Sequence, residues 1–416
     1  MAKTQAKNFI KIVTVVGARP NFMKAGPILG AIRNHNKLGK TPGIQHLLVH
    51  TGQHYDALMS DQFFTDLDLP TPDVHLGVGS GSQGFQTAQV LEKFESVLTR
   101  EVPDLVIVVG DVNSTLACAL ATAKLNVTSN TSRPLVAHVE AGLRSFDRAM
   151  PEEINRIVTD HVADILFVTE KSGLDNLRHE GIPSERVFFV GNTMIDSLVA
   201  FKRQADKSTV LSKLRLNHQG TNKHRPSAKP YALMTLHRPS NVDEPMALRN
   251  VLEGIHEVSE TLEVIFPVHP RTRKRIREFG LGQFFQTDES NSGTGIRLID
   301  PLGYLDFLCL MKNAHLVLTD SGGIQEETTC LGVPCVTLRE NTERPVTVKQ
   351  GTNVIAGTCA ARIGQAIKAQ LTRKQKASIP PKWDGKAAQR IVPILVEQIG
   401  NRARVHASSE IALAPR

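Results

Sequence analysis

The chain has 416 residues, 41% hydrophobic and 22% charged, which is an ordinary globular composition with room for two or three domains. No apolar run approaches the roughly 20 residues that span a bilayer, and no signal-peptide core follows the basic N-terminus. We therefore expect a cytoplasmic protein with no membrane partner. A net charge of +8 admits nucleic-acid binding, but no aromatic residue interrupts the basic run 271–277. We interpret that run as a solvated helix face and expect no nucleic-acid partner.

Continuous apolar runs followed by helical periodicity recur along the chain. Such runs indicate strands buried on both faces, and their alternation with helices predicts doubly wound parallel sheets. The predicted strands are 12–16, 47–50, 105–109, 135–139, 165–168, 231–236, 262–268 and 316–318.

The polar, basic stretch 207–229 interrupts this repeat, so we interpret it as a linker. It separates a predicted N-terminal Rossmann-like domain, 8–206, from a C-terminal one, 230–380. A helix is predicted at 381–400 and a disordered tail at 401–416. We expect the ligand in a central cleft between the two domains, at the carboxyl ends of the strands.

Two cations follow the first predicted strand. Arg19 lies in the strand-to-helix turn and Lys24 about one helical turn later. Together they could clamp a diphosphate. The alternative is ordinary surface charge beside a helix-starting proline.

Three carboxylates also lie at strand or helix ends. Asp111 follows the third run and could be a helix N-cap or a cleft carboxylate. Glu140 ends a buried strand, where it must be paired or used, and Arg144 is a plausible structural partner. Glu152 opens a predicted helix and shares a face with Arg156 at i,i+4 spacing.

The run 316–318 ends at a Ser-Gly-Gly turn that leads into a helix. Ser321 is a good N-cap residue, and Gly322 and Gly323 let a ligand approach the free amides of the helix start. Glu327, one turn further on, could accept from ribose hydroxyls. His237 ends the first strand of the second half, where it could contact a polyphosphate or act as an acid or base.

These residues predict a nucleotide-sugar site. No G-x-G-x-x-G motif follows the first strand, and no His/Cys cluster or C-x-x-C pair occurs. We therefore expect no dinucleotide cofactor, no metal and no disulfide. The residues alone leave proton transfer and glycosyl transfer equally open.

In this order, the segments resemble the non-hydrolysing UDP-N-acetylglucosamine 2-epimerases. Hydrolysing relatives lack the Arg-Pro-x-x-x-Lys form of the first motif. The matching stretches are Gly17-x-Arg19-Pro20-x-x-x-Lys24, Thr51-Gly52-Gln53-His54, Gly110-Asp111-x-x-Ser114, His138-Val139-Glu140-Ala141-Gly142-Leu143-Arg144, Pro151-Glu152-Glu153-x-Asn155-Arg156, His237-Arg238, Ser321-Gly322-Gly323-Ile324-Gln325-Glu326-Glu327 and Thr342-Glu343-Arg344-Pro345.

The resemblance implies a two-domain fold of the glycosyltransferase-B type, a homodimer, and no metal or redox cofactor. It implies that UDP-GlcNAc and UDP-ManNAc are interconverted, through elimination and re-addition of UDP by way of 2-acetamidoglucal, for surface polysaccharide. By position it assigns catalysis to Asp111, Glu140, Glu152 and His237. It assigns substrate contacts to Arg19, Lys24, His237, Phe307, Ser321, Gly322, Gly323, Glu327 and Arg344.

The chain departs from the family pattern at two positions. Asn21 stands where a glutamate is common, which bears on local hydrogen bonding and sugar preference. Asp56 stands where a glutamine of an allosteric substrate site is common, so we do not expect activation by substrate. The alternatives are a 2-epimerase of a related UDP-2-acetamido sugar such as a diacetamido-uronate, a glycosyltransferase of the same fold, or a non-catalytic UDP-sugar sensor.

Overall fold

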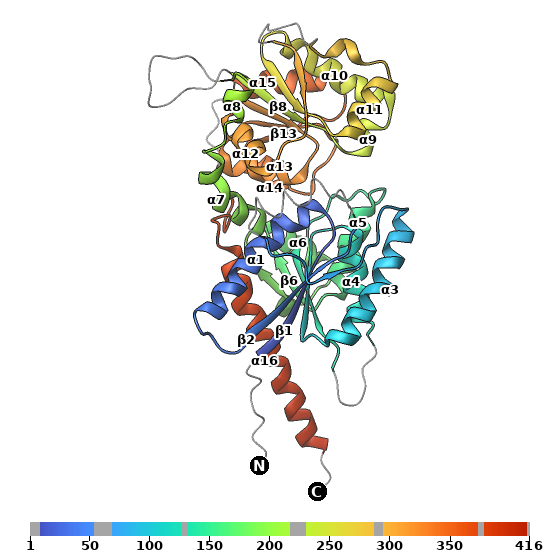
Figure 1. Ribbon diagram of the computed structural model, residues 1–416, viewed down its shortest axis with the longest axis vertical. Coiled ribbons are helices and arrows are strands. Elements are labelled where there is room, and N and C mark those ends of the chain that lie inside the picture. The colour runs from blue at the N-terminus through green and yellow to red at the C-terminus, as the bar shows by residue number, and fades with distance from the viewer. Residues whose placement is uncertain are drawn as a thin grey trace. The chain divides into compact units, whose positions relative to one another are not determined.

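The computed structural model describes residues 9–53, 69–125, 132–216, 230–286, 294–372 and 378–413. It divides into two compact units (Figure 1). Unit 1 comprises Met1–Ser197 and Pro381–Arg416, and unit 2 comprises Leu198–Pro380.

Unit 1 is built on a parallel sheet of seven strands in the order β3-β2-β1-β4-β5-β6-β7. Helices connect successive strands, and α1 packs against α16 from the far end of the chain. The strands are β1 (Phe9–Val16), β2 (Gly43–His50), β3 (Val74–His75), β4 (Leu105–Val109), β5 (Leu135–Ala141), β6 (Ile165–Val168) and β7 (Val187–Phe189). The helices are α1 (Arg19–Lys37), α3 (Gln83–Glu101), α4 (Asn113–Ala123), α5 (Pro151–Val162), α6 (Lys171–His179), α7 (Thr193–Ala205) and α16 (Ala387–Leu413).

Unit 2 carries a parallel sheet of six strands in the order β10-β9-β8-β11-β12-β13. The strands are β8 (Tyr231–Thr235), β9 (Glu263–Pro267), β10 (Ile296–Ile299), β11 (Leu316–Thr319), β12 (Cys335–Thr337) and β13 (Asn353–Ile355). The helices are α8 (Val210–Lys213), α9 (Pro239–Val242), α10 (Pro245–Ser259), α11 (Pro270–Glu278), α12 (Tyr304–Asn313), α13 (Gly322–Leu331), α14 (Pro345–Lys349) and α15 (Ala360–Thr372).

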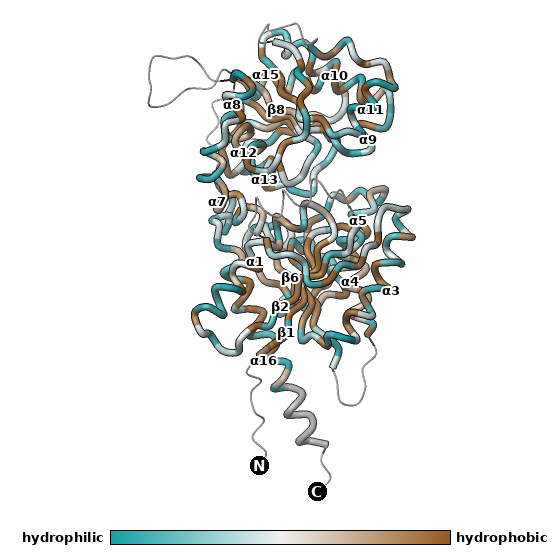
Figure 2. Tube along the Cα trace, in the orientation of Figure 1, coloured by the Kyte–Doolittle hydropathy of each residue, from teal (hydrophilic) through white to brown (hydrophobic). Residues whose placement is uncertain are grey.

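Each unit buries its own core around its sheet. All five residues of β4 are buried, as continuous apolar strands covered on both faces require. Figure 2 shows hydrophobic residues concentrated along the strands of both sheets. The prediction of two doubly wound parallel sheets is confirmed. In the part of the chain that the structure describes, no helix is both long and apolar enough to span a membrane.

The borders between segments differ from those predicted. The division falls at Ser197, inside α7, since that helix is continuous from Thr193 to Ala205. Leu216, in the predicted linker, is fully buried. Helix α16 runs on to Leu413, through most of the stretch from residue 401 that the sequence predicted as a tail. Residues 401–413 contain no proline or glycine that would end the helix.

The basic run 271–277 lies on α11, as predicted. Arg271 and Arg275 pair with Asp243, and Arg273 pairs with Asp300 at 3.0 Å. Acidic neighbours therefore neutralise much of the charge that suggested nucleic acid.

Gly17 marks a close approach just after β1. A Cβ added there would lie 2.2 Å from Ser114 Oγ and 2.7 Å from Thr51 Oγ1. Both of those residues are buried, so the turn requires glycine for space.

We predict that Gly17→Ala lowers the free energy of unfolding by about 1–3 kcal/mol, the usual effect of overpacking. Gly30→Ala is the matched control, because an added Cβ meets nothing within 4 Å there and alanine favours the α1 helix. Urea unfolding followed by fluorescence of Trp383 checks this, since that sole tryptophan is buried in unit 1. Equal effects of the two substitutions would contradict the packing argument.

Candidate active site

In unit 1 the candidate residues follow three neighbouring strands. Lys24 follows β1, Asp111 follows β4 and Glu140 ends β5, and these strands are adjacent in the order β1-β4-β5. Parallel strands place these ends at one edge of the sheet, where α/β proteins bind their ligands.

Lys24 and Glu140 form a buried ion pair. Lys24 Nζ donates to Glu140 Oε1 at 2.7 Å, and the two residues are only 4% and 3% exposed. Glu140 has φ of 79°, in the left-handed region, at an irregularity where the register of β5 against β6 shifts between Val139 and Ala141. A glutamate held in this conformation costs backbone energy, which is typical of functional sites.

Arg144 is a scaffold residue with partners other than the one expected. Its Nη1 lies 2.7 Å from Asp160, and its Nε and Nη2 donate to Glu180 at 2.8 and 2.7 Å. Asp160 also contacts His138 Nδ1 at 2.7 Å and accepts from the Gly142 amide. The structural pairing considered for Glu140 with Arg144 is thus replaced by the pair with Lys24.

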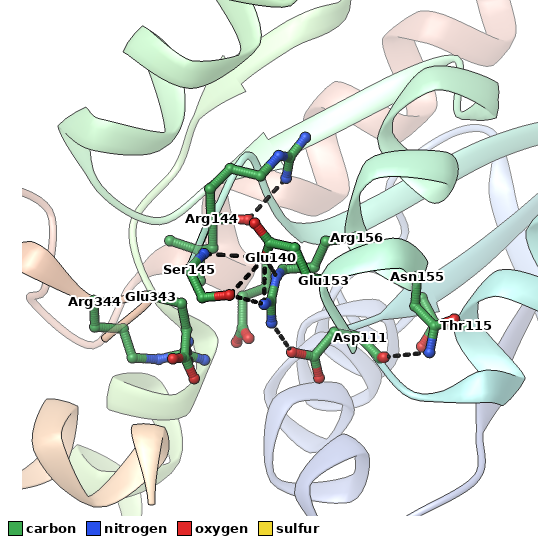
Figure 3. Close-up of polar contacts among 12 residues, drawn as sticks. Asp111, Thr115, Glu140, Arg144, Ser145, Glu153, Asn155, Arg156, Glu343 and Arg344 are labelled. Atoms are coloured by element: carbon green, nitrogen blue, oxygen red, sulfur yellow. Dashed lines mark hydrogen bonds and ion pairs between the residues drawn. The ribbon is translucent and has the colours of Figure 1, made fainter. Parts of the chain in front are cut away.

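Asp111 is held by an arginine rather than used as a helix cap. Val112 is the N-cap of α4, whereas the Asp111 carboxylate pairs with Arg156 Nη1 (Figure 3). Arg156 is 2% exposed and also bonds Glu153 through Nε at 2.9 Å. The interpretation of Asp111 as a cap is therefore wrong.

Glu153, rather than Glu152, is the residue that pairs with Arg156, although the i,i+4 spacing favoured Glu152. Glu153 is the carboxylate that faces Arg156, and it accepts from the amides of Ser145 and Phe146 at 3.0 and 2.8 Å (Figure 3). These bonds, together with Arg156, hold the pKa of Glu153 below its usual value despite its burial. The side chain of Glu152 is half-buried and makes no hydrogen bond or ion pair with the described residues.

Asn21 organises the turn between β1 and α1. Its Oδ1 accepts from the amides of Gly17 and Ala18 at 3.1 and 3.0 Å, and its Nδ2 donates to Val109 O at 2.8 Å. This asparagine therefore has a structural role at its departure from the family pattern. Arg19 opens α1, but its side chain lies outside the described residues.

A second polar network joins β2 to the start of α4. Gln53 Oε1 accepts from the Ser114 amide at 3.1 Å and from its hydroxyl at 2.8 Å. Thr51 Oγ1 lies 2.7 Å from the same hydroxyl. His54 and Asp56, to which the motif and the allosteric comparison also referred, lie outside the described residues.

In unit 2 a helix starts at the Ser-Gly-Gly turn, since α13 begins at Gly322. Ser321 is the N-cap by position, but its hydroxyl makes no cap hydrogen bond. Since an α-helix leaves its first amides without internal partners, those of Gly322 and Gly323 can donate to an anion. A Cβ at Gly322 would lie 2.7 Å from Glu343 Oε1, so a larger residue there would displace the Glu343 carboxylate.

Arg344, predicted to contact substrate, lies in a buried cluster behind this helix start. It is 3% exposed, and its Nε donates to Glu326 at 2.8 Å. Its Nη1 lies 3.2 Å from Glu343, which also pairs with Arg339 at 2.9 Å. The bond to Glu326 ties Arg344 to α13.

The nucleoside residues predicted from the resemblance lie on two helices. Glu327, on α13, accepts from the Tyr304 hydroxyl at 2.8 Å, and burial raises the pKa of Glu327 to about 7. Phe307 lies on the first turn of α12 with Tyr304 and is half-buried. Helices α12 and α13 pack together.

His237 follows β8 and contacts a buried carboxylate. Its Nδ1 lies 2.9 Å from Asp320 Oδ1, while 57% of the imidazole is exposed. Asp320 follows β11, the neighbour of β8, and is fully buried. Burial alone would lower the pKa of His237, but the Asp320 charge raises it. Asp320, Glu153 and Tyr304 had no assigned role in the sequence, although Asp320 directly precedes the Ser-Gly-Gly turn.

No group of three or more His, Cys, Asp or Glu side chains within the described ranges is arranged to hold a metal ion.

A family model and two relatives match this chain by sequence. The family model described as UDP-N-acetylglucosamine 2-epimerase matches residues 36–396. The chain is 42% identical to the UDP-N-acetylglucosamine 2-epimerase of Methanocaldococcus jannaschii, covering 93% of this chain and 99% of that one. It is 38% identical to the UDP-2,3-diacetamido-2,3-dideoxy-D-glucuronate 2-epimerase of Pseudomonas aeruginosa, covering 93% and 100%.

Two solved structures are similar to this one over 93% of the chain. The crystal structure of the M. jannaschii UDP-GlcNAc 2-epimerase in complex with UDP-GlcNAc and UDP has a TM-score of 0.81, with 93% of this chain and 100% of that chain covered. The Neisseria meningitidis enzyme bound to UDP-GlcNAc has a TM-score of 0.76 at 29% identity, covering 93% and 100%. The two-unit architecture is thus of the glycosyltransferase-B type, and the chain belongs to the UDP-N-acetylglucosamine 2-epimerase family.

Proposed function

We propose that this chain interconverts UDP-GlcNAc and UDP-ManNAc by eliminating UDP and adding it back. The observation that carries the proposal is the buried Lys24–Glu140 pair on strained backbone, at the same sheet edge as Asp111. The names of relatives up to 42% identical along nearly the whole chain support the substrate.

The proton, the electron pairs and the leaving group of the elimination step can all be accounted for. A carboxylate of unit 1 takes the C2 proton, and the C2–H electrons form a C1=C2 double bond. The C1–oxygen bond to the β-phosphate breaks, and UDP leaves with its electron pair. In the return step a protonated group of unit 1 delivers a proton to C2 on the opposite face, the electrons of the C1=C2 double bond form the new C2–H bond, and an oxygen of the β-phosphate re-forms its bond to C1. Because a C2–H is a very weak acid, stabilising the departing UDP matters as much as the base.

We assign the two ends of the substrate to the two units. Unit 2 binds the nucleotide through the Gly322 and Gly323 amides, His237, Glu327 and Phe307. Unit 1 acts on the sugar. Glu152 is suited to proton transfer because no other described side chain competes for it, whereas Arg156 orients Asp111. Arg19 and Lys24 supply positive charge, and Arg344 holds α13 in place.

The runner-up is a 2-epimerase of a related UDP-2-acetamido sugar. The P. aeruginosa relative, named for a diacetamido-glucuronate, favours it at 38% identity. We further propose a homodimer on family grounds, with a sedimentation mass near twice 45.6 kDa as its test. A role in supplying surface polysaccharide is part of the same proposal.

The reaction is tested by incubating the protein with UDP-GlcNAc in deuterated water without added cofactor. We predict that NMR detects UDP-ManNAc and deuterium at C2 of both sugars. Absence of both products would reject this substrate, while exchange only with a diacetamido-uronate would establish the runner-up. Transfer of sugar to an acceptor without C2 exchange would indicate a glycosyltransferase.

A second prediction separates catalysis from scaffolding at Glu140. Glu140→Gln leaves Lys24 buried without its partner, so we expect about 3–5 kcal/mol of destabilisation. We also expect turnover to fall by roughly 100-fold or more. The single variant is therefore expected to lose both stability and turnover, so it cannot by itself separate a catalytic role of Glu140 from a structural one.

The double variant Lys24→Met/Glu140→Gln is the matched control, because it removes both buried charges and so should regain most of the stability. If Glu140 or Lys24 acts on the substrate, turnover stays lost in this variant. Recovery of both stability and turnover would make the pair a scaffold element only. Thermal unfolding and the C2 exchange rate provide the two readouts.

A third prediction concerns the pH dependence of UDP affinity. With its pKa raised to about 7, Glu327 gains its charge as pH rises through neutrality and then accepts from ribose hydroxyls more strongly. We expect the charge of Glu327 by itself to raise UDP affinity by roughly tenfold across that range, because hydrogen bonds to charged groups contribute about 1.5–3 kcal/mol.

Two substitutions check the assignment by calorimetry. Glu327→Gln should flatten the rise. Tyr304→Phe should move its midpoint to higher pH, because the Tyr304 hydroxyl lowers the pKa of Glu327. An unchanged midpoint in Tyr304→Phe, or an unchanged rise in Glu327→Gln, would remove Glu327 from the ribose site.

A further inference from the structure

Asp320 accepts more hydrogen bonds than a simple turn residue needs. Its carboxylate takes the backbone amides of His237 and Arg238 at 3.0 and 2.9 Å, and the Asn241 side chain at 3.2 Å. It also lies 2.9 Å from Nδ1 of His237. The residue is fully buried at the end of β11 and directly precedes Ser321, the N-cap of α13.

Resting on the proposed function, we infer that Asp320 is a positioning residue that orients His237 as a charged donor to the diphosphate of the substrate. The carboxylate binds both the backbone and the ring of His237, and it lies in the turn that begins the anion-binding helix. One buried group therefore links the two phosphate-binding parts of unit 2.

The geometry fixes which ring nitrogen is available. An ionised carboxylate only accepts hydrogen bonds, so Nδ1 must carry the proton that faces Asp320. Nε2 is then left for the ligand, and more than half of the imidazole is exposed. The amide bonds to His237 and Arg238 limit how far the ring can shift.

The electrostatics agree with a charged imidazole. Asp320 faces His237 with negative charge, while Arg238 and Arg339 face it with positive charge. Burial and the two arginines lower the pKa of His237, but Asp320 outweighs them and raises it. The pKa of Asp320 is in turn lowered by His237 and by the two amides, against the effect of its burial.

The charge on His237 makes UDP affinity depend on pH. The contribution of the imidazolium to UDP binding is complete below the pKa of His237 and is lost as pH rises through it. Because this contribution has the opposite sign to that of Glu327, it is followed in a Glu327→Gln background. Removing the charge of Asp320 lowers that pKa, so the loss should begin at a lower pH. A single neighbouring charge of this kind shifts a pKa by about one unit or more.

The first measurement is an NMR titration of 15N-labelled histidine in the full-length protein, compared with UDP calorimetry across pH. In Asp320→Asn we expect the pKa of His237 and the alkaline loss of UDP affinity to move down together by about one unit or more. Asparagine retains an oxygen that can accept from the amides, so the fold of the turn is kept as far as possible.

Two further variants separate positioning from scaffolding. Asn241→Ala removes another bond of Asp320, along with one to Leu338 O, and should lower thermal stability without moving the pKa of His237. In a His237→Ala background, Asp320→Asn should no longer change the pH profile of UDP affinity.

Several outcomes would overturn the inference. They are an unshifted pKa of His237 in Asp320→Asn, a fall in UDP affinity that is equal at all pH values, or a full effect of Asp320→Asn without His237. These readouts need only UDP, so they stand if the C2 exchange experiment fails. Failure of the epimerase proposal is thereby distinguished from failure of this one.

Discussion

The buried ion pair between Lys24 and Glu140 is the constraint around which unit 1 is arranged. Two charges removed from water are unfavourable unless they meet in good geometry, and here their atoms lie 2.7 Å apart. Glu140 reaches Lys24 from a left-handed backbone conformation, which adds a further local cost. The surrounding sheet must hold both residues in place for the pair to persist.

Much of the neighbouring structure stabilises that arrangement. Asn21 ties the amides before α1 to the end of β4, and therefore fixes the helix that carries Lys24. On the other side, Arg144 and Asp160 hold the chain that follows Glu140. Unit 2 is stabilised in a similar way. Arg344 pairs with Glu326 and Glu343 in a buried cluster beside Gly322, where α13 begins. In both units, buried ionic contacts fix the segments that carry the proposed ligand-binding groups.

The repeat pattern and the strand ends could be predicted because they depend on local sequence. Strands 105–109 and 165–168 have the bounds that the apolar runs predicted. The short strands β12 and β13 were missed, since three residues carry no recognisable pattern. The candidate residues Asp111 and Glu140 were found because polar groups directly after buried strands are unusual.

The partners of these residues could not be predicted, because they depend on contacts far apart in the chain. Lys24 and Glu140 are separated by 116 positions, while Arg144 was the closer and more obvious partner in sequence. Similarly, i,i+4 spacing favoured Glu152 as the partner of Arg156, but the helix geometry selects Glu153 at i,i+3. Asp320 was quoted only as part of a turn, because its partner His237 lies 83 positions away in the chain.

The central claim is that UDP leaves the sugar and returns during each epimerisation. The most direct test uses UDP-GlcNAc with 18O in the bridge between C1 and the β-phosphorus, followed by 31P NMR of the recovered substrate. If the C1–oxygen bond breaks and re-forms, the label moves into the non-bridging positions of the β-phosphate as the sugar epimerises. Epimerisation with the label retained in the bridge would contradict the account.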